Sequence, residues 1–222
     1  MSARTFGIVT GLRAEAAIAR RCAHLVASTG GRPADAELKA AELIERGAVA
    51  LVSFGVAGGL APELAPGAVV VATGVIVRNT TIATDAAWCA RLVEALPRAV
   101  AGPVLGGDRV IARAQQKAEL FRRTGALAVD LESGGVARVA ASSGIPFAVV
   151  RAIADSAASD LPPAALVGLD RRGRIDVGAV LGSLWREPGQ LAQLVATACD
   201  TRAAFTALRR GVRQLGADLR AG

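Results

Sequence analysis

The sequence contains few aromatic residues, one histidine and three cysteines, and these shortages exclude several classes of protein. Aromatic residues make up 3% of the 222 positions and tyrosine is absent, so aliphatic side chains must fill the core. The cysteines, Cys22, Cys89 and Cys199, lie far apart and form no CxxC pair. Together with His24 they can assemble neither a zinc site nor a disulfide framework. The single histidine also argues against a Ser-His-Asp triad.

The chain also lacks a long uninterrupted apolar run. Arg13 and Glu15 follow the first apolar residues too early to leave room for the core of a signal peptide. The most apolar region, Gly47–Val77, is interrupted by prolines and by Glu63, so no segment resembles a membrane span. These features predict a cytoplasmic protein.

Basic residues outnumber acidic ones by 26 to 19, which gives a net charge of +7 and a pI of about 10.8. A basic nucleic-acid-binding module is therefore one alternative for the function. However, the lysines and arginines are spread along the chain and are not interleaved with the aromatic residues that base stacking would use. We therefore expect a solvated basic surface and no nucleic-acid partner.

Short apolar runs alternate with alanine-rich stretches, a pattern typical of α/β proteins. The apolar runs are continuous, which indicates strands covered on both faces. We predict one domain over residues 1–222. The predicted strands are Phe6–Thr10, Val49–Phe54, Ala68–Val77, Pro103–Ile111, Leu127–Leu131 and Phe147–Ile153. The predicted helices are Ala14–Ser28, Ala34–Arg46, Asp85–Leu96, Ala114–Arg123, Ser133–Ser143, Val177–Trp185 and Pro188–Leu219.

Acidic residues follow three of the predicted strands. Glu15 comes shortly after the first strand, Glu132 ends the fifth and Asp155 ends the sixth. Ligands of open α/β sheets bind outside the carboxyl ends of the strands, so the three carboxylates should converge at one edge. Each also has a structural interpretation, because helix N-termini favour carboxylates and an aspartate can serve as an N-cap. Arg151 lies in a strand that should be buried, so we expect it to pair with Glu132 or Glu15 in a structural role.

The segment Gly55-Val56-Ala57-Gly58-Gly59 follows the second predicted strand. It does not fit GxGxxG, because Ala57 occupies the place of the second glycine, and a dinucleotide site is therefore disfavoured. Two interpretations stay open. Either the backbone N–H groups approach an anion or a sugar, or the segment is a tight turn that needs positive φ.

Five segments in the first two thirds of the chain carry a further signal. They are Gly7-Ile8-Val9 leading to Glu15, Gly55–Pro62, Gly107–Ile111, Ala128–Ser133 and Pro146–Asp155. In this order they resemble the nucleoside phosphorylases and methylthioadenosine/adenosylhomocysteine nucleosidases. The resemblance implies an α/β fold with a central mixed β-sheet flanked by helices. It also implies an enzyme that cleaves the N-glycosidic bond of a purine nucleoside without a metal or organic cofactor.

The resemblance implies a role for each carboxylate. Asp155 would be the acid that protonates the departing purine, and burial would raise its pKa. Glu132 would bind the ribose hydroxyls and stabilise positive charge on the sugar, and Glu15 would activate water or orient another nucleophile. The other predicted substrate-binding residues are Leu131, Val110, Ile111 and Gly58, and the predicted phosphate-binding residues are Arg13 and Gly11.

Two positions depart from the pattern of the family. Val56 stands where the family usually has a hydroxyl, and Val110 stands where it has a purine-stacking aromatic residue. A nucleoside-binding protein without turnover is therefore a second alternative. The two signals for the nucleophile conflict, because Arg13 favours inorganic phosphate as a co-substrate whereas Glu15 favours water. We lean slightly to phosphate, because a neutral water would not need the cation of Arg13.

The C-terminal region carries a looser resemblance. Gly168–Arg174 and Arg186-Glu187-Pro188 resemble the hopanoid-associated phosphorylase branch, which implies the lipid-linked substrate adenosylhopane. Within the predicted helix Pro188–Leu219, a row of arginines follows an apolar stripe. Such a helix either packs its stripe on the sheet, which we favour, or makes a peripheral contact with anionic lipid. We also expect a homo-oligomer.

Overall fold

The computed structural model describes residues 5–166 and 188–215. Its strands are β1 (Phe6–Thr10), β2 (Leu25–Ser28), β3 (Ala50–Gly59), β4 (Val69–Val77), β5 (Thr80–Ala83), β6 (Ala99–Gly106), β7 (Ala128–Asp130) and β8 (Phe147–Asp155). Its helices are α1 (Arg13–Ala19), α2 (Asp35–Glu45), α3 (Ala86–Ala95), α4 (Ala114–Thr124), α5 (Ser133–Ser142), α6 (Pro163–Leu166), the 3₁₀ helix η1 (Pro188–Gln190) and α8 (Leu191–Leu215).

All eight strands belong to one mixed sheet, and part of that sheet closes on itself. β3 pairs with β8 in parallel, β8 pairs with β4 antiparallel, and β4 and β6 are parallel. β6 then pairs with β7, which returns to β3. β1 and β2 extend the sheet beyond β3, and β5 extends it beyond β4. The predicted α/β fold with a central mixed sheet is thereby confirmed, and the closed part brings the ends of β3, β7 and β8 together.

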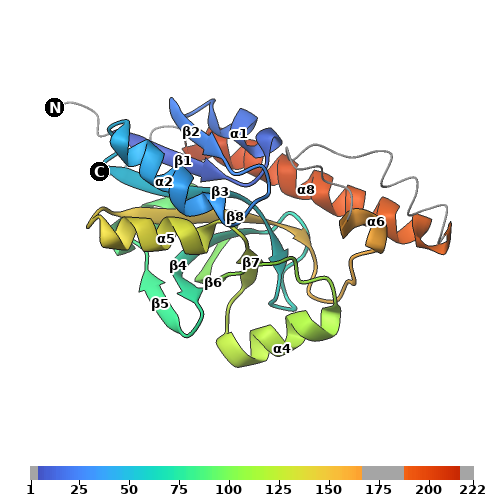
Figure 1. The fold of residues 1–222 in the computed structure, drawn as a ribbon. Helices are drawn as coiled ribbons and strands as arrows, with labels where there is room; N and C mark the ends of the chain where they lie inside the picture. The colour runs from blue at the N-terminus through green and yellow to red at the C-terminus, as the bar shows by residue number, and fades with distance from the viewer. Residues whose placement is uncertain (1–4, 167–187, 216–222) are drawn as a thin grey trace.

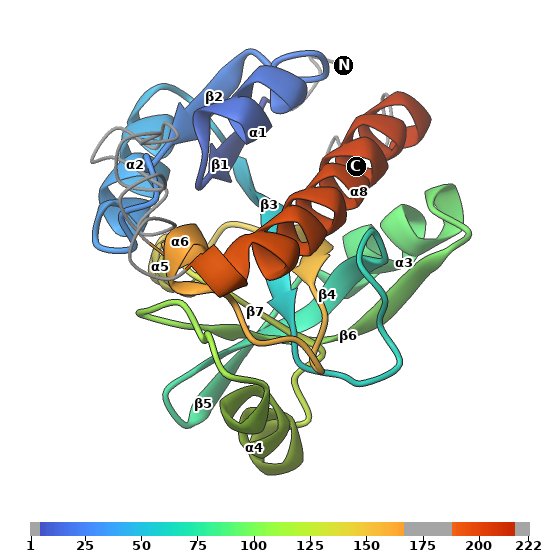
Figure 2. The ribbon, with the colours of Figure 1, turned by 90° about the vertical axis from the view of Figure 1, so that its right-hand side faces the viewer.

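Helices cover both faces of the sheet (Figure 1). α1, α3 and α8 pack on one face, and α2 and α5 pack on the other. The sequence of β8 is a continuous apolar run because both faces of this strand are covered. Its residues Ala148, Val150 and Ala152 face the first layer, whereas Phe147, Val149 and Ile153 face the second. α4 lies apart from both layers, below the sheet in the two views (Figure 2).

The structure corrects the N-terminal part of the prediction. The helix predicted over Ala14–Ser28 ends at Ala19, and β2 follows it as an edge strand that pairs in parallel with β1. The segment is alanine-rich, and only the pairing with β1 decides that its last four residues are extended. β5, another edge strand, was also absent from the prediction.

The glycine segment after the second predicted strand is not a turn. β3 continues to Gly59, where it pairs with β8 and with β7, and no glycine between residues 55 and 59 has positive φ. β6 ends at Gly106, so residues 107–111 of the predicted fourth strand form a loop instead. The predicted helix Val177–Trp185 lies outside the described residues.

The long C-terminal helix is partly packed. Ala204, Leu208, Val212 and Leu215 of α8 are buried against the sheet, whereas Leu191 and Val195 near its start are each 55% exposed. The packing favoured from the sequence is therefore confirmed for the second half of α8. Within the described residues, no helix is both long and apolar enough to cross a membrane.

Candidate active site

Three carboxylates converge on one cavity of about 470 Å³. Glu15 reaches it from the first turn of α1, Glu132 from the segment after β7, and Asp155 from the last residue of β8. β1, β3 and β8 are parallel, so their carboxyl ends lie at the same edge of the sheet, as expected. This rule accounts for Glu15 and Asp155. β7, which precedes Glu132, runs antiparallel to β3, so the rule does not place Glu132, yet its side chain lines the same cavity.

Glu15 is fixed by two backbone N–H groups. Its Oε2 accepts from Leu12 N at 2.7 Å and its Oε1 accepts from Val56 N at 2.8 Å. The first bond satisfies the residue that precedes α1, which is the structural role weighed from the sequence. The second bond ties the carboxylate to β3 and holds it at the wall of the cavity. Glu15 therefore has a structural role and also lies in place for chemistry.

Glu132 faces the cavity and does not cap α5. The backbone N–H groups of Glu132 and Ser133 instead donate to Oδ1 of Asp130, at 2.8 and 2.7 Å. Asp130 thus serves as the cap, and the side chain of Glu132 is left free to accept from Thr29 Oγ1 at 3.3 Å. Glu132 therefore stands at the N-terminus of α5, as the structural interpretation expected, but its side chain makes no capping hydrogen bond.

Arg151 is the central cation of this region and is fully buried. Its NH2 group donates to Asp130 Oδ1 at 2.9 Å and to the hydroxyls of Ser53 and Ser133. Its NH1 group lies 3.6 Å from Glu132 Oε2. The predicted pairing with Glu132 is present, and Asp130 is a second partner that the sequence did not suggest. A buried arginine needs such partners because its charge has left water.

Burial sets the electrostatics of the cavity. It raises the pKa of Glu132 to about 7, and the nearby charges of Asp130 and Glu15 act in the same direction, although Arg151 opposes them. Burial also raises the pKa of Glu15, against Arg151 and the backbone N–H groups that favour the ionised form. Raised pKa values at carboxylates in one cavity are typical of acid–base sites.

Asp155 has a partner of its own, Lys117. The Lys117 ammonium is fully buried and donates to Asp155 Oδ2 and to the carbonyl oxygens of Ser156 and Ser159, the last two at 2.8 Å. Burial raises the pKa of Asp155, and Lys117 limits that rise. Asp155 is not an N-cap, because within the described residues it is followed by a loop and not by a helix.

At two glycine positions, the carboxylates of the site occupy the space that a larger side chain would need. A Cβ atom on Gly55 would come within 2.6 Å of Glu15 Oε1, and one on Gly11 would come within 2.7 Å of Glu132 Oε1. Neither residue has positive φ. Gly55 of β3 and Gly11, directly after β1, therefore make room for the site's own side chains.

The structure brings most predicted site residues to the cavity and leaves one outside. Gly11, Gly58, Val110, Ile111 and Leu131 all line it with the three carboxylates. Val110 is 53% exposed, at the mouth. Arg13, predicted to bind phosphate, is exposed and is absent from the lining, because the first turn of α1 directs it outward. Arg32 and Arg109 line the cavity instead.

Lys117, Asp130 and Thr29 were missed by reasoning from the sequence. Asp130 and Thr29 carry no local signal of their partners, which lie on other elements. Lys117 did have a signal. The chain contains two lysines among its 26 basic residues, so a lysine at position 117 is unusual for this sequence. Its place four residues into an amphipathic helix hid that signal.

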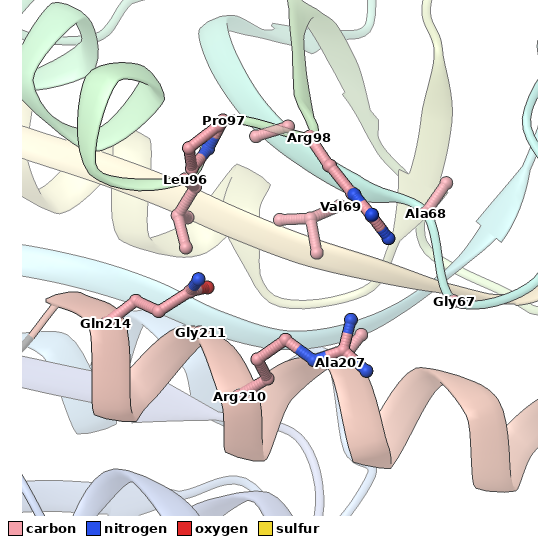
Figure 3. A pocket seen from close by; sticks show the side chains of 11 residues that line it. Gly67, Ala68, Val69, Leu96, Pro97, Arg98, Ala207, Arg210, Gly211 and Gln214 are labelled. Atoms are coloured by element: carbon pink, nitrogen blue, oxygen red, sulfur yellow. The ribbon is translucent and has the colours of Figure 1, made fainter.

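A second cavity, of about 480 Å³, lies between α8 and the strands β4 and β6 (Figure 3). Among the described residues, Arg98 and Arg210 line it with Gln214 and apolar residues. Within the described part of the chain, no cluster of three or more histidine, cysteine, aspartate and glutamate residues could hold a metal ion.

The fold and the carboxylate cavity agree with the sequence relationships of the chain. The sequence model of the Phosphorylase superfamily matches residues 20–171, more than half of the chain. The chain therefore belongs to the phosphorylase superfamily. This confirms the predicted family and the predicted class of enzyme, which acts on glycosidic bonds.

Individual relatives and solved structures are also similar to the chain. A 5′-methylthioadenosine/S-adenosylhomocysteine nucleosidase of Mycobacterium tuberculosis is 28% identical, with 61% of this chain and 71% of that protein covered. One from Treponema pallidum is 38% identical over 63 residues, which span 23% of its length. Among solved structures, S-adenosylhomocysteine nucleosidase from Streptococcus pyogenes has a TM-score of 0.71 at 19% identity, covering 99% of this chain and 97% of that one. Futalosine hydrolase of Helicobacter pylori has a TM-score of 0.67 at 17% identity, covering 96% and 99%.

Proposed function

We propose that this protein hydrolyses the N-glycosidic bond of a 5′-substituted adenine nucleoside and releases adenine. One observation carries the proposal: Glu15, Glu132 and Asp155 line one cavity, and each has different fixed partners. Three carboxylates with different surroundings can divide the work of acid, base and charge stabilisation. The names of the relatives from Mycobacterium tuberculosis and Treponema pallidum support the choice of adenine nucleosides.

In the proposed reaction Asp155 acts on the base. It transfers a proton from Oδ1 to the imidazole nitrogen of the purine while the bond between C1′ and the base breaks, and the bonding electrons leave with the base. Oδ1 suits this role because Lys117 occupies Oδ2, whereas within the described residues Oδ1 makes no hydrogen bond. Adenine then departs as a neutral molecule, which lowers the barrier.

Glu132 and Glu15 act on the sugar in this proposal. As the bond breaks, positive charge develops on the ribose ring, and a carboxylate that holds the ribose hydroxyls stabilises it. Glu132 is placed for that contact beside Thr29. Glu15 accepts a proton from the attacking water, whose oxygen forms the new bond to C1′. Its raised pKa makes it a stronger base than an exposed glutamate.

Water is the proposed nucleophile, in preference to phosphate. The phosphorolytic alternative relied on Arg13, and that side chain lies outside the cavity lining. Arg32 lines the cavity but already pairs with Asp35. Glu15, which suits water, is buried at the cavity wall. This placement reverses the slight preference for phosphate that the sequence alone would support.

We propose that the ribose carries a 5′ substituent and assign no chemical structure to it. The resemblance to the hopanoid-associated branch rests on Gly168–Arg174 and on Arg186–Pro188, and most of these residues lie outside the described ones. The mouth of the cavity at Val110 and Arg109 is exposed, which leaves room for a substituent of either small or large size.

Product analysis tests the proposal. The protein is incubated with 5′-methylthioadenosine, S-adenosylhomocysteine or adenosine, with and without inorganic phosphate, and products are separated by chromatography. We expect free adenine and free ribose derivative at equal rates in both buffers. Release that requires phosphate and yields ribose 1-phosphate would show a phosphorylase. Binding of the nucleosides without adenine release would show a nucleoside-binding protein.

A further inference from the structure

Lys117 is the least expected charged residue of the site. The chain uses arginine at 24 positions and lysine at two, Lys39 and Lys117. Lys39 lies on the surface of α2 and pairs with Glu42. Lys117, in contrast, has no exposed surface. A chain that uses arginine almost everywhere has placed a lysine where the cation is buried against the proposed catalytic acid.

The contacts of Lys117 identify the form of its side chain. Its Nζ has three acceptors, which are Asp155 Oδ2 and the carbonyl oxygens of Ser156 and Ser159. An ammonium group has three N–H donors and no acceptor, so it satisfies all three oxygens. A neutral amine would point its lone pair at one of them. The planar fork of an arginine would not match three oxygens that surround a single atom.

α4, which carries Lys117, is tied to the loop after β8 at a second point. Asp160 Oδ1 accepts from Ala114 N at 2.7 Å, at the first residue of α4, and its Oδ2 pairs with Arg113 at 3.0 Å. Leu161 N also donates to Ala112 O at 2.8 Å. The loop that precedes α4 carries Val110 and Ile111, which line the cavity. The loop before α4, α4 itself and the loop after β8 are therefore linked to one another, so the cavity mouth, Lys117 and Asp155 are connected.

We propose that Lys117 is a positioning residue for Asp155, holding its Oδ2 so that Oδ1 faces the purine and neutralising the carboxylate formed when the proton has left. This inference rests on the proposed function. In the resting enzyme Asp155 carries a proton on Oδ1 while Oδ2 accepts from Lys117. Proton transfer to the purine leaves a negative charge on Asp155, and the Lys117 ammonium stands beside it. Asp155 regains its proton from solvent after adenine leaves.

The arrangement balances two opposing effects. Burial alone would make Asp155 a weak acid that releases its proton reluctantly, because a carboxylate is unstable away from water. Lys117 lowers the pKa of Asp155 and so limits that effect. The charged groups that face Asp155 are Lys117 from α4 and Asp200 from α8, and the charge of Asp200 acts in the opposite direction to Lys117. Besides Asp155, Lys117 faces Asp160.

The test compares two leaving groups. Adenine needs a proton in order to leave, whereas p-nitrophenolate leaves without one. We expect Lys117→Met to lower kcat/KM for the adenine nucleoside by on the order of 10- to 100-fold. Its kcat/KM for a p-nitrophenyl riboside with the same 5′ group should stay within about threefold of wild type, because only the step that Asp155 assists is changed. The matched control Lys39→Met should cleave both substrates like the wild type.

The pH profile provides a readout that a purely structural role would not move. Loss of the Lys117 charge raises the pKa of Asp155, so the alkaline limb of kcat/KM should move to higher pH in Lys117→Met. In Asp200→Asn the limb should move to lower pH, because a negative charge near Asp155 is removed. Equal losses on both substrates with an unmoved alkaline limb would overturn the role of Lys117. A wild type that cleaves neither substrate would overturn the proposed function itself.

A measurement on the wild type covers the case in which Lys117→Met does not fold. Two lysines give two side-chain ammonium signals in ¹⁵N NMR, and Lys39→Arg assigns them. We expect the Lys117 signal to persist as an ammonium group and to shift with pH over the same range as the alkaline limb of kcat/KM. A Lys117 signal that does not respond over that range would overturn the inference.

Discussion

The two sides of the cavity hold their carboxylates by different means. On the proposed ribose side, Glu15 and Glu132 face one buried cation, Arg151, which belongs to the central strand β8. On the proposed base side, Asp155 faces Lys117, which comes from α4 outside the two helical layers (Figure 2). The ribose side thus depends on the core of the sheet, whereas the base side depends on a peripheral helix. We therefore expect that the proposed sugar binding and acid chemistry can be altered separately.

The largest expected effect concerns the acid on the base side. Asp155→Asn should lower adenine release by on the order of 10²- to 10⁴-fold, because an amide cannot supply the proton. Circular dichroism should show an unchanged fold. The matched control is Asp108→Asn, an exposed aspartate on the loop before α4. Adenine release near the wild-type rate from folded Asp155→Asn would remove Asp155 from the mechanism.

The cation of the ribose side should matter chiefly for stability. Arg151→Met leaves Asp130 and Glu132 buried without their positive partner, at a cost of about 3–5 kcal/mol in the free energy of unfolding. Urea titration at pH 8 measures it, with Arg138→Met as the control because that arginine pairs with Glu37 at the surface. The loss should shrink at acid pH, where the carboxylates are protonated. An unchanged urea midpoint at pH 8 would contradict the central role of Arg151.

Protonation of Glu132 links stability to pH on the same side. Burial raises the pKa of folded Glu132 to about 7, above the ordinary value of 4.5. Between those values the folded chain holds a proton that the unfolded chain has lost, so this residue's contribution to stability falls as pH rises from about 4.5 to about 7. As pH rises through that window, Glu132→Gln should therefore become more stable relative to wild type. Urea midpoints of the two proteins at several pH values measure the difference, and the exposed Glu63→Gln should show no such trend.

The smallest expected effect concerns the residue that the structure leaves outside the cavity. Arg13→Ala should change adenine release by less than about twofold, since an exposed side chain away from the reacting atoms adds little to catalysis. Arg109→Ala is the variant for comparison, because Arg109 lines the cavity at its mouth. A large loss in Arg13→Ala that depends on phosphate concentration would restore the phosphorolytic alternative.

Much of the site could be predicted because it follows from local sequence. β1 and β8 are continuous apolar runs. Glu15 follows β1 in the first turn of α1, and Asp155 is the last residue of β8. β2 could not be predicted in the same way, because pairing with β1 makes the end of an alanine-rich segment extended. The sequence left two interpretations open for the glycines before Gly59. In the structure, Glu15 lies behind Gly55 and takes the space of a side chain.

By itself, the sequence determined the α/β class, the family and the three carboxylates at the ends of strands, because apolar runs and their spacing are local properties of the chain. The sequence also indicated that Arg151 pairs with Glu132 or Glu15, but only the tertiary structure decided which of them lies beside it and gave Asp155 its partner Lys117. Arg151 and Lys117 reach Glu132 and Asp155 from other elements, and Arg13 is directed away by the first turn of α1. The direction of a side chain and the charge that it meets depend on how distant elements pack, and a linear pattern does not record that.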